Sequence, residues 1–331
     1  MLKLFKLFII LALLGPCLLP VTARADIMEE VNEPLTNYYR NPDPAKIPGF
    51  LEKVAPSDFI KNSETEVISM VAYLFARIAQ LEPSLVPEYI KIFEQPSQTH
   101  EARVFILMIL QVCGDEKTAG YLKSKLSDKD FQNERKDIEY ALAGPIPVGF
   151  NALKNEIKRG VDLDYLWAEF FATGNSVAIT QIISVLSWKD VVREKLQNWL
   201  YNKHSKAEVR KLERLLVQEM GVEIDFENSL ILSRDDLDCI YSNFANNSGG
   251  PGQVSKSAVE IRKILGISDE ELMPVVVKGA AMWSLIMNSE QHDKVYQICQ
   301  SELELLGDKA PFQLAMIVEI VRQTLGGSSG T

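Results

Sequence analysis

Three histidines, His100, His204 and His292, are the side chains best suited to proton transfer or metal binding. None of them forms an HExxH pair or lies near a cysteine at metal-ligand spacing, so the sequence predicts no zinc site. His292 follows Trp283 and Asn288 near an expected helix junction. Its ring would there bond a backbone carbonyl or cap a turn, and ligand binding together with Trp283 and Asn288 is the alternative.

A glycine-rich segment, GPGQVSKS at residues 250–257, resembles a phosphate-binding loop. In such a loop the glycines let backbone amides cradle phosphates, while the lysine reaches the terminal group. Here Ser255 stands where the second required glycine belongs, and no buried strand is expected before the segment. The sequence therefore favours a flexible linker, in agreement with the adjoining run NNSGGPG at residues 246–252.

Acidic side chains are further candidates for chemistry. Asp235, Asp236 and Asp238 offer the oxygen ligands that calcium prefers, but the glycine and terminal glutamate of a calcium loop are missing. Charges at a helix N-terminus explain these aspartates better. The chain contains no Gly-x-Ser-x-Gly sequence, and no cysteine has a histidine partner nearby in sequence. We therefore assign no catalytic residue, no metal ligand and no cofactor.

Aromatic side chains are the candidates for binding. Residues of this type at helical spacing usually fill a core, which is the interpretation we favour, and a recognition groove is the alternative. The predicted binding residues come from two stretches of the chain and are Trp167, Phe170 and Phe171 together with Trp283, Asn288 and His292.

The elements that carry these residues are predicted to be helices. Apolar residues recur at spacings of three and four along most of the chain, with stop signals between the runs. Ser63 to Glu66 has the capping-box arrangement and predicts a helix that runs to about Leu81. Further helices are expected near residues 254–265, 269–288, 290–306 and 310–325. The predicted fold class is all-α.

Three glycines recur at thirty-residue spacing, at Gly114, Gly144 and Gly174. A glycine after an apolar helix supplies the left-handed residue that ends the helix. A large apolar residue stands four positions before each glycine, and these are Leu110, Tyr140 and Phe170. A period of this length fits a helix-turn-helix unit, which buries its apolar face only by stacking on its neighbours.

Asp115 and Asn175 directly follow two of these glycines and are residue types that begin a new helix. The arrangement resembles the turn of HEAT-type helical repeats over roughly residues 100–220, and tetratricopeptide (TPR) repeats match it less well. This resemblance implies a HEAT/TPR-like solenoid of stacked antiparallel helix pairs.

A second internal similarity predicts two related halves. The stretch DLDYLWAEFFA at residues 162–172 agrees in type with DLDCIYSNFAN at residues 236–246. We expect an N-terminal helical-repeat half at 26–221, a linker or short hairpin at 222–233 and a C-terminal helical half at 234–325. Residues 326–331 are expected to form a disordered tail.

The first 25 residues have the order of a secretory signal peptide. Lys3 and Lys6 precede an apolar run from Leu7 to Val21, which is shorter than a membrane-spanning helix and is followed by small residues. Cleavage between Ala25 and Asp26 is predicted, and lipid modification at Cys17 is the alternative. The protein would then be exported, either to the periplasm or to the medium, with no membrane-spanning segment after the leader is removed.

Charge and cysteine content limit the partners. The net charge is −10, and removal of the leader takes away three basic residues, so nucleic acid and anionic lipid surfaces are not expected partners. The predicted mature chain retains Cys113, Cys239 and Cys299, which allow at most one disulfide. Their apolar helical surroundings favour three buried thiols.

The segment AAMWSL at residues 280–285, with Asn288 and His292, and the segment DLDYLWAEFFATG at 162–174 are similar to signatures in a group of exported helical bacterial proteins without assigned activity. This resemblance implies a fold and export, and it supplies no reaction. The sequence thus predicts an exported helical scaffold that binds a protein or peptide, and it leaves the oligomeric state open. An enzyme or accessory subunit that acts on envelope polymers with acidic residues in a cleft is the alternative, and an effector released to a host is a third hypothesis.

Overall fold

The computed structural model describes residues 25–114, 116–143, 150–189, 191–202, 204–220 and 256–327. Every regular element in these ranges is a helix, which confirms the predicted all-α class. The described chain forms two compact units: the first holds residues 25–156 and 161–179, and the second holds residues 157–160 and 180–327. The boundary between the units falls within one helix, α11 (Ser176–Val185).

Several predicted features lie outside the described residues. They are the leader up to Arg24, Asp115, Gly144, the linker at 222–233, the second copy at 236–246 with its aspartates and Cys239, the loop at 246–252 and the last four residues of the tail. The division into two related halves therefore stays a prediction.

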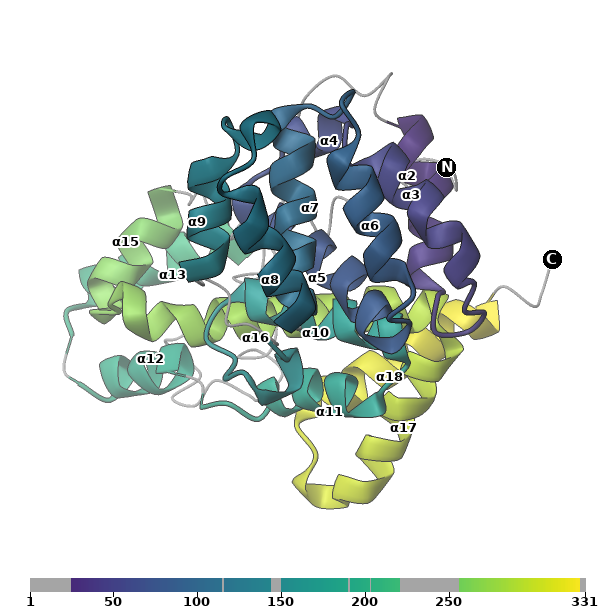
Figure 1. The fold of residues 1–331 in the computed structure, drawn as a ribbon. Helices are drawn as coiled ribbons and strands as arrows, with labels where there is room; N and C mark the ends of the chain where they lie inside the picture. Colours follow the sequence, from purple (N-terminus) through teal and green to yellow (C-terminus); the bar gives the residue numbers. More distant parts are fainter. Residues whose placement is uncertain are drawn as a thin grey trace. The chain divides into compact units, whose positions relative to one another are not determined.

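The first unit is built from short helices (Figure 1). Its helices are α2 (Ala25–Thr36), α3 (Ile47–Val54), α4 (Asp58–Asn62), α5 (Thr65–Leu81), α6 (Leu85–Glu94), α7 (His100–Cys113), α8 (Glu116–Lys125), α9 (Arg135–Ala143), α10 (Gly160–Thr173) and the start of α11. Short 3₁₀ turns, η1 (Pro44–Lys46), η2 (Lys129–Phe131) and η3 (Ala152–Lys154), lie between them.

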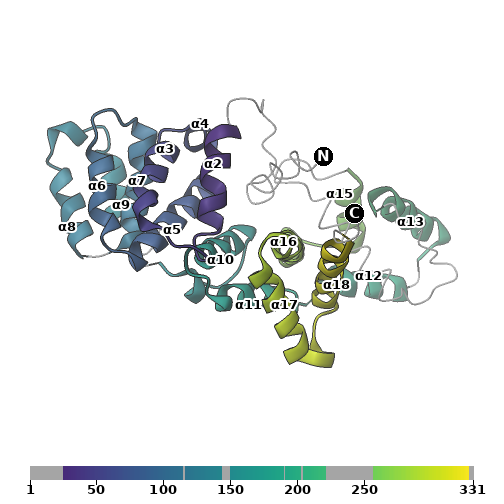
Figure 2. The ribbon, with the colours of Figure 1, turned by 90° about the vertical axis from the view of Figure 1, so that its right-hand side faces the viewer.

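Two helices, α5 and α7, form the centre of this unit because most of their apolar side chains are buried. Tyr73 and Phe75 on α5 and Phe105 on α7 are inaccessible to solvent, and the rings of Phe75 and Phe105 meet edge to face at 6.3 Å. Helices α6 and α9 pack on α7, as Figure 2 shows. One face of α5 nevertheless carries polar side chains that form hydrogen bonds with other helices of this unit.

The predicted capping box at Ser63 to Glu66 is wrong. Glu64 is the N-cap of α5 and makes no side-chain cap hydrogen bond, whereas Ser63 is the C-cap of α4 and donates its amide to the carbonyl of Phe59. The preceding short helix therefore takes the serine that the pattern gives to the next helix. A complete capping box occurs instead at Ser268 and Glu271.

The predicted glycine turns are confirmed at the two described positions. Gly114 and Gly174 each have φ of 67°, and their amides donate to the carbonyls of Leu110 and Phe170, four residues back. Asn175 accepts a hydrogen bond from the amide of Val177 and begins α11, as expected of an N-cap residue. Tyr140, the apolar residue expected in the same register, is instead 65% exposed, so the burial pattern does not repeat there.

The second unit contains the end of α11 and the helices α12 (Val191–Tyr201), α13 (Lys206–Met220), α15 (Lys256–Leu265), α16 (Asp269–Gln291), α17 (Asp293–Leu306) and α18 (Phe312–Gly327), with η4 (Gly307–Lys309) before α18. The four helices predicted after residue 250 are all present with small shifts of their ends. Helix α18 runs two residues into the predicted tail.

Helix α16 is the centre of the second unit. It packs against α12, α17 and α18, and its inward face carries Val277, Ala281 and Leu285, none of which is accessible to solvent. By length and composition, Glu270–Gln291 is the one described helix that could cross a membrane, with a mean hydropathy of 1.2. Because 56% of its apolar window is buried in the protein, the core helix of a folded unit accounts for this composition.

Candidate functional site

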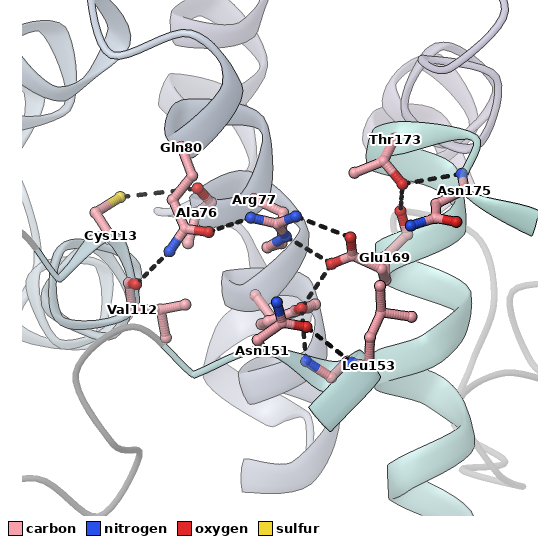
Figure 3. Close-up of polar contacts among 12 residues, drawn as sticks. Ala76, Arg77, Gln80, Val112, Cys113, Asn151, Leu153, Glu169, Thr173 and Asn175 are labelled. Carbon is pink, nitrogen blue, oxygen red and sulfur yellow. Dashed lines mark hydrogen bonds and ion pairs between the residues drawn. The ribbon is translucent and has the colours of Figure 1, made fainter. Parts of the chain in front are cut away.

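The first unit contains a network of buried and partly buried polar side chains that begins on α10. Asp162, Tyr165, Glu169 and Thr173 follow one another at spacings of three and four residues, so they lie on one face of this helix. Figure 3 shows Glu169 of α10 pointing toward Arg77 of α5.

Glu169 is the centre of this network and its side chain is 1% exposed. Its Oε2 accepts hydrogen bonds from Arg77 Nε at 2.5 Å and from Tyr73 Oη at 2.7 Å, and its Oε1 accepts from Arg77 Nη2 at 2.8 Å. Paired, charge-assisted hydrogen bonds of this kind are the strongest that side chains make. Although burial alone would lower it, the pKa of Arg77 is raised above its ordinary value by the hydrogen bonds and charge of Glu169.

The network of polar side chains continues from Arg77 to the end of α7. Arg77 Nη1 donates to Gln80 Oε1, and Gln80 Nε2 donates to the carbonyl of Val112 at 2.7 Å (Figure 3). A carbonyl near the end of a helix lacks a partner within that helix, and Gln80 supplies one. The polar network therefore joins α10, α5 and α7.

Tyr73 extends the network in the other direction. Its Oη accepts the amide of Ala152 at 3.0 Å while donating to Glu169, so the hydroxyl is used twice. Burial, and next the charge of Glu169, raise the pKa of this phenol. The ring packs edge to face against Phe150 and Tyr165, with centroids 5.4 Å away in each case. We call Tyr73, Arg77, Gln80 and Glu169 the polar clamp.

The clamp positions helices and leaves little capacity for chemistry. Each carboxylate oxygen of Glu169 already accepts from a protein donor, and Arg77 is only 16% exposed. Removal of one partner from a buried ion pair typically costs about 3–5 kcal/mol, because the other charge is left without compensation. The clamp is therefore a structural centre of the first unit.

Two aspartates at the start of α10 are better candidates for chemistry than the residues of the clamp. The pKa of Asp164 is raised to about 7, first by burial and second by the charge of Asp162. Asp162 Oδ1 accepts a hydrogen bond from Asn155 Nδ2 at 3.3 Å. A carboxyl group that titrates near neutral pH can act as a general acid, and burial is one way in which proteins raise a carboxyl pKa to that range.

The predicted binding residues of the first unit are in its core. Trp167, Phe170 and Phe171 are all buried, and the rings of Trp167 and Phe171 stack at 5.8 Å. Tyr39 packs on Phe170 from the loop after α2, with ring centroids 4.7 Å apart. This placement corresponds to the core interpretation of these aromatics.

The three predicted binding residues on and after α16 differ from one another. Trp283 is 44% exposed, whereas Asn288 and His292 are buried. Asn288 Nδ2 donates to the carbonyl of Ser284 in the same helix at 2.9 Å. His292 is both the C-cap of α16 and the N-cap of α17, and its backbone carbonyl accepts from the amide of Val295. Of the three, Trp283 is the residue that a partner can reach.

Thiols and metal ligands add no second centre within the described ranges. Cys113 is partly exposed, Cys299 is buried and neither forms a disulfide, and burial raises the pKa of Cys299 to about 11. His100 lies 3.5 Å from Glu134 and 3.7 Å from Asp137, but no group of three ligand-type side chains there could hold a metal ion.

Sequence reasoning missed the polar clamp, although a signal for it exists. Arg77 stands inside the apolar run AYLFARIA of α5, and Glu169 stands inside LWAEFFA of α10. A charged residue within an otherwise buried helix needs a partner of opposite charge. One basic and one acidic residue of this kind in two helices are therefore candidates for a pair.

Comparison with known proteins gives no match, whether to a family model, to a curated protein or to a solved structure.

Proposed function

We propose that this protein is an exported helical module that binds a protein or peptide partner. The observation that carries the proposal is the exposure of large apolar side chains on α16, where Trp283 is 44% and Met273 is 41% exposed. Aromatic and methionine side chains are enriched at sites of protein binding. The acidic net charge favours a partner other than nucleic acid.

The proposed architecture is a HEAT/TPR-like solenoid in which helix pairs stack on one another. Support comes from two helix–glycine–helix turns, at Gly114 and Gly174, and from the packing of α8 and α9 on α7. Stacked pairs of this type present extended surfaces, and such folds bind peptides and proteins for that reason. The similarity of 162–172 to 236–246 supports a duplication of this arrangement.

Export is the second part of the proposal, and the leader sequence supports it. Helix α2 begins at Ala25, the residue before the predicted cleavage point, and its first buried side chain of the described set is Val31. Cleavage between Ala25 and Asp26 would thus leave on the mature chain all the residues of α2 that are described as buried. The resemblance to exported helical bacterial proteins without assigned activity points the same way.

To test export, the full chain with its leader is expressed in a bacterial host, and the N-terminus of the product is identified in each cell fraction. A periplasmic or secreted product that begins at Asp26 is the expected result, and an uncleaved cytoplasmic product contradicts export. Crosslinking and affinity capture from the envelope fraction then follow. The proposal expects one recurring protein that is lost with Trp283→Ala and retained with Leu305→Ala, a control that alters an exposed leucine on α17.

A second function is supported by Asp164. A carboxyl group with a pKa of about 7 beside Asp162 fits an enzyme, or an accessory subunit, that acts on envelope polymers by general acid catalysis. Hydrolysis of purified envelope glycans that is abolished by Asp164→Asn, with folding intact, would establish this activity. Equal hydrolysis by the original chain and the variant would reject it.

A further inference from the structure

Helix α16 has a narrow exposed line of apolar residues. Met273, Val276, Ala280 and Trp283 follow one another at spacings of three, four and three residues. Met273, Ala280 and Trp283 are exposed, and Val276 is partly exposed. This spacing is that of the a and d positions of a heptad, which face a partner helix in coiled coils. We call these four residues the α16 stripe.

The rest of α16 holds the stripe in place. Val275, Val277 and Ala281 stand next to stripe residues in sequence and are buried against the other helices of the second unit. Residues in a packed core keep their backbone fixed, so the stripe is presented without a cost of ordering it on binding. Side chains spaced alternately by three and four residues fit the grooves of another helix. The geometry therefore favours an α-helical partner.

Acidic residues flank the stripe at both ends. Glu270 is exposed and lies one turn before Met273, and the partly exposed Glu290 lies seven residues after Trp283. The lysine between them, Lys278, points inward, because it is buried and donates to the carbonyl of Trp188 at 3.1 Å. Lys278 is the one basic residue of α16, so this helix itself presents no basic side chain along the stripe to balance the two glutamates.

This charge pattern distinguishes the possible partners. A second copy of α16 would place acidic residues opposite acidic residues in both the parallel and the antiparallel orientation, which is unfavourable. A helix with basic residues at both ends would place opposite charges together. The whole chain carries a net charge of −10, which would also speed the approach of a cationic partner.

We propose that the α16 stripe binds an amphipathic α-helix that has an apolar a/d stripe over two heptads and basic residues at both ends. This inference rests on the proposed function, since it specifies the partner of a binding module. The apolar side chains of the partner would cover Trp283 and Met273, and its terminal basic residues would lie near Glu270 and Glu290.

The probe for the test is a synthetic helical peptide of about 18 residues, long enough for two heptads and both charged ends. It carries leucine at the a and d positions and lysines at both ends. A second peptide has the same leucines and glutamates in place of the lysines. Binding of labelled peptides to the full chain is measured by fluorescence anisotropy, and the lysine peptide is expected to bind at least about tenfold more tightly.

Variants of the protein locate the site. Trp283→Ala is expected to weaken binding of the lysine peptide about tenfold or more, because a buried tryptophan usually contributes much of the affinity of an interface. Ala280→Glu adds a charge at an exposed position in the middle of the stripe and is expected to abolish binding while the fold is retained. Leu305→Ala, on α17, is expected to leave binding unchanged. Circular dichroism confirms that each variant is folded.

Charge reversal tests the second half of the inference. The double variant Glu270→Lys, Glu290→Lys is expected to prefer the glutamate peptide. Equal affinity for the two peptides, or binding that survives both Trp283→Ala and Ala280→Glu, would overturn the inference. A dimer in sedimentation experiments that Ala280→Glu dissociates would also overturn it, in favour of a second copy.

The outcomes separate this inference from the proposed function. If affinity capture finds a partner that Ala280→Glu still binds, the binding module stands and the α16 stripe is not its site. If neither a captured partner nor the lysine peptide binds the folded chain, both proposals fail.

Discussion

In the first unit α5 and α10 meet through a buried carboxylate that accepts hydrogen bonds from two side chains, whereas in the second unit α16 meets its neighbours mainly through apolar side chains. Buried Asn288 of α16 bonds to its own helix, but Glu169 bonds to residues more than ninety positions away. Hydrogen bonds are directional, and apolar contacts are not. The polar clamp therefore fixes one arrangement of helices, whereas α16 combines a core face with an exposed apolar face.

The largest effect that would break this contrast is expected from Glu169→Ala. Because the variant leaves the guanidinium of Arg77 partly buried without a counter-charge, it should lower the free energy of unfolding by about 3–5 kcal/mol. Urea denaturation followed by circular dichroism measures the change. Glu139→Ala is a matched control, since Glu139 pairs with Arg135 on the surface, and it should cost at most about 1 kcal/mol. Similar losses in both variants would show that the clamp is no stronger than a surface pair.

Tyr73→Phe sharpens the same contrast with a smaller expected effect. The substitution keeps the ring and its contacts with Phe150 and Tyr165, but it removes the hydroxyl between the Ala152 amide and Glu169. Loss of one partner of buried polar groups should cost about 1–3 kcal/mol. Urea denaturation of this variant beside Tyr140→Phe, which alters an exposed tyrosine, isolates the contribution of the buried hydroxyl.

In the second unit the corresponding polar contribution is the capping box of α16. Ser268→Ala removes the acceptor for the Glu271 amide and should cost about 1 kcal/mol. Thermal unfolding followed by circular dichroism measures it, with Ser301→Ala on the exposed face of α17 as a control. A loss as large as that of Glu169→Ala would mean that the second unit depends on polar contacts as much as the first.

A pH dependence is expected from Asp164 in the first unit. Its pKa in the folded chain is raised to about 7, whereas an unfolded aspartate titrates near about 3.9. Between these values the folded state binds more protons than the unfolded state, so this group stabilises the fold at low pH and the contribution is lost as pH rises toward 7. Asp164→Asn should therefore gain stability relative to the original chain from about pH 4 to about pH 7. A difference that is constant over this range, measured by urea denaturation, would contradict the raised pKa.

Local signals predicted the helices well, because amphipathic spacing and glycine ends depend on residues close in sequence. The turns at Gly114 and Gly174 are examples. The capping box at Ser63 failed because two helices compete for one serine, which a pattern of four residues does not reveal. The polar clamp could not be located, since Arg77 and Glu169 are separated by 92 positions and only the packed fold brings them together.

The predicted binding residues likewise include some whose placement follows from local spacing and some whose placement depends on the packed fold. Trp167 and its neighbours have the spacing of a core helix, and the structure places them in the core. Trp283 has a similar sequence context but is exposed, and burial of one helix face by other elements decides that difference. Hydrophobic spacing identifies the apolar faces of α16 without showing which of them a neighbour covers.

The long separation between the partners of the polar clamp has a kinetic consequence. Closing a loop of this length costs chain entropy before the ion pair forms, so the pair is expected to form late in folding. An interaction that is absent from the transition state slows unfolding and leaves the folding rate unchanged. The clamp between Arg77 and Glu169 would then set the lifetime of the folded first unit more than the speed at which it forms.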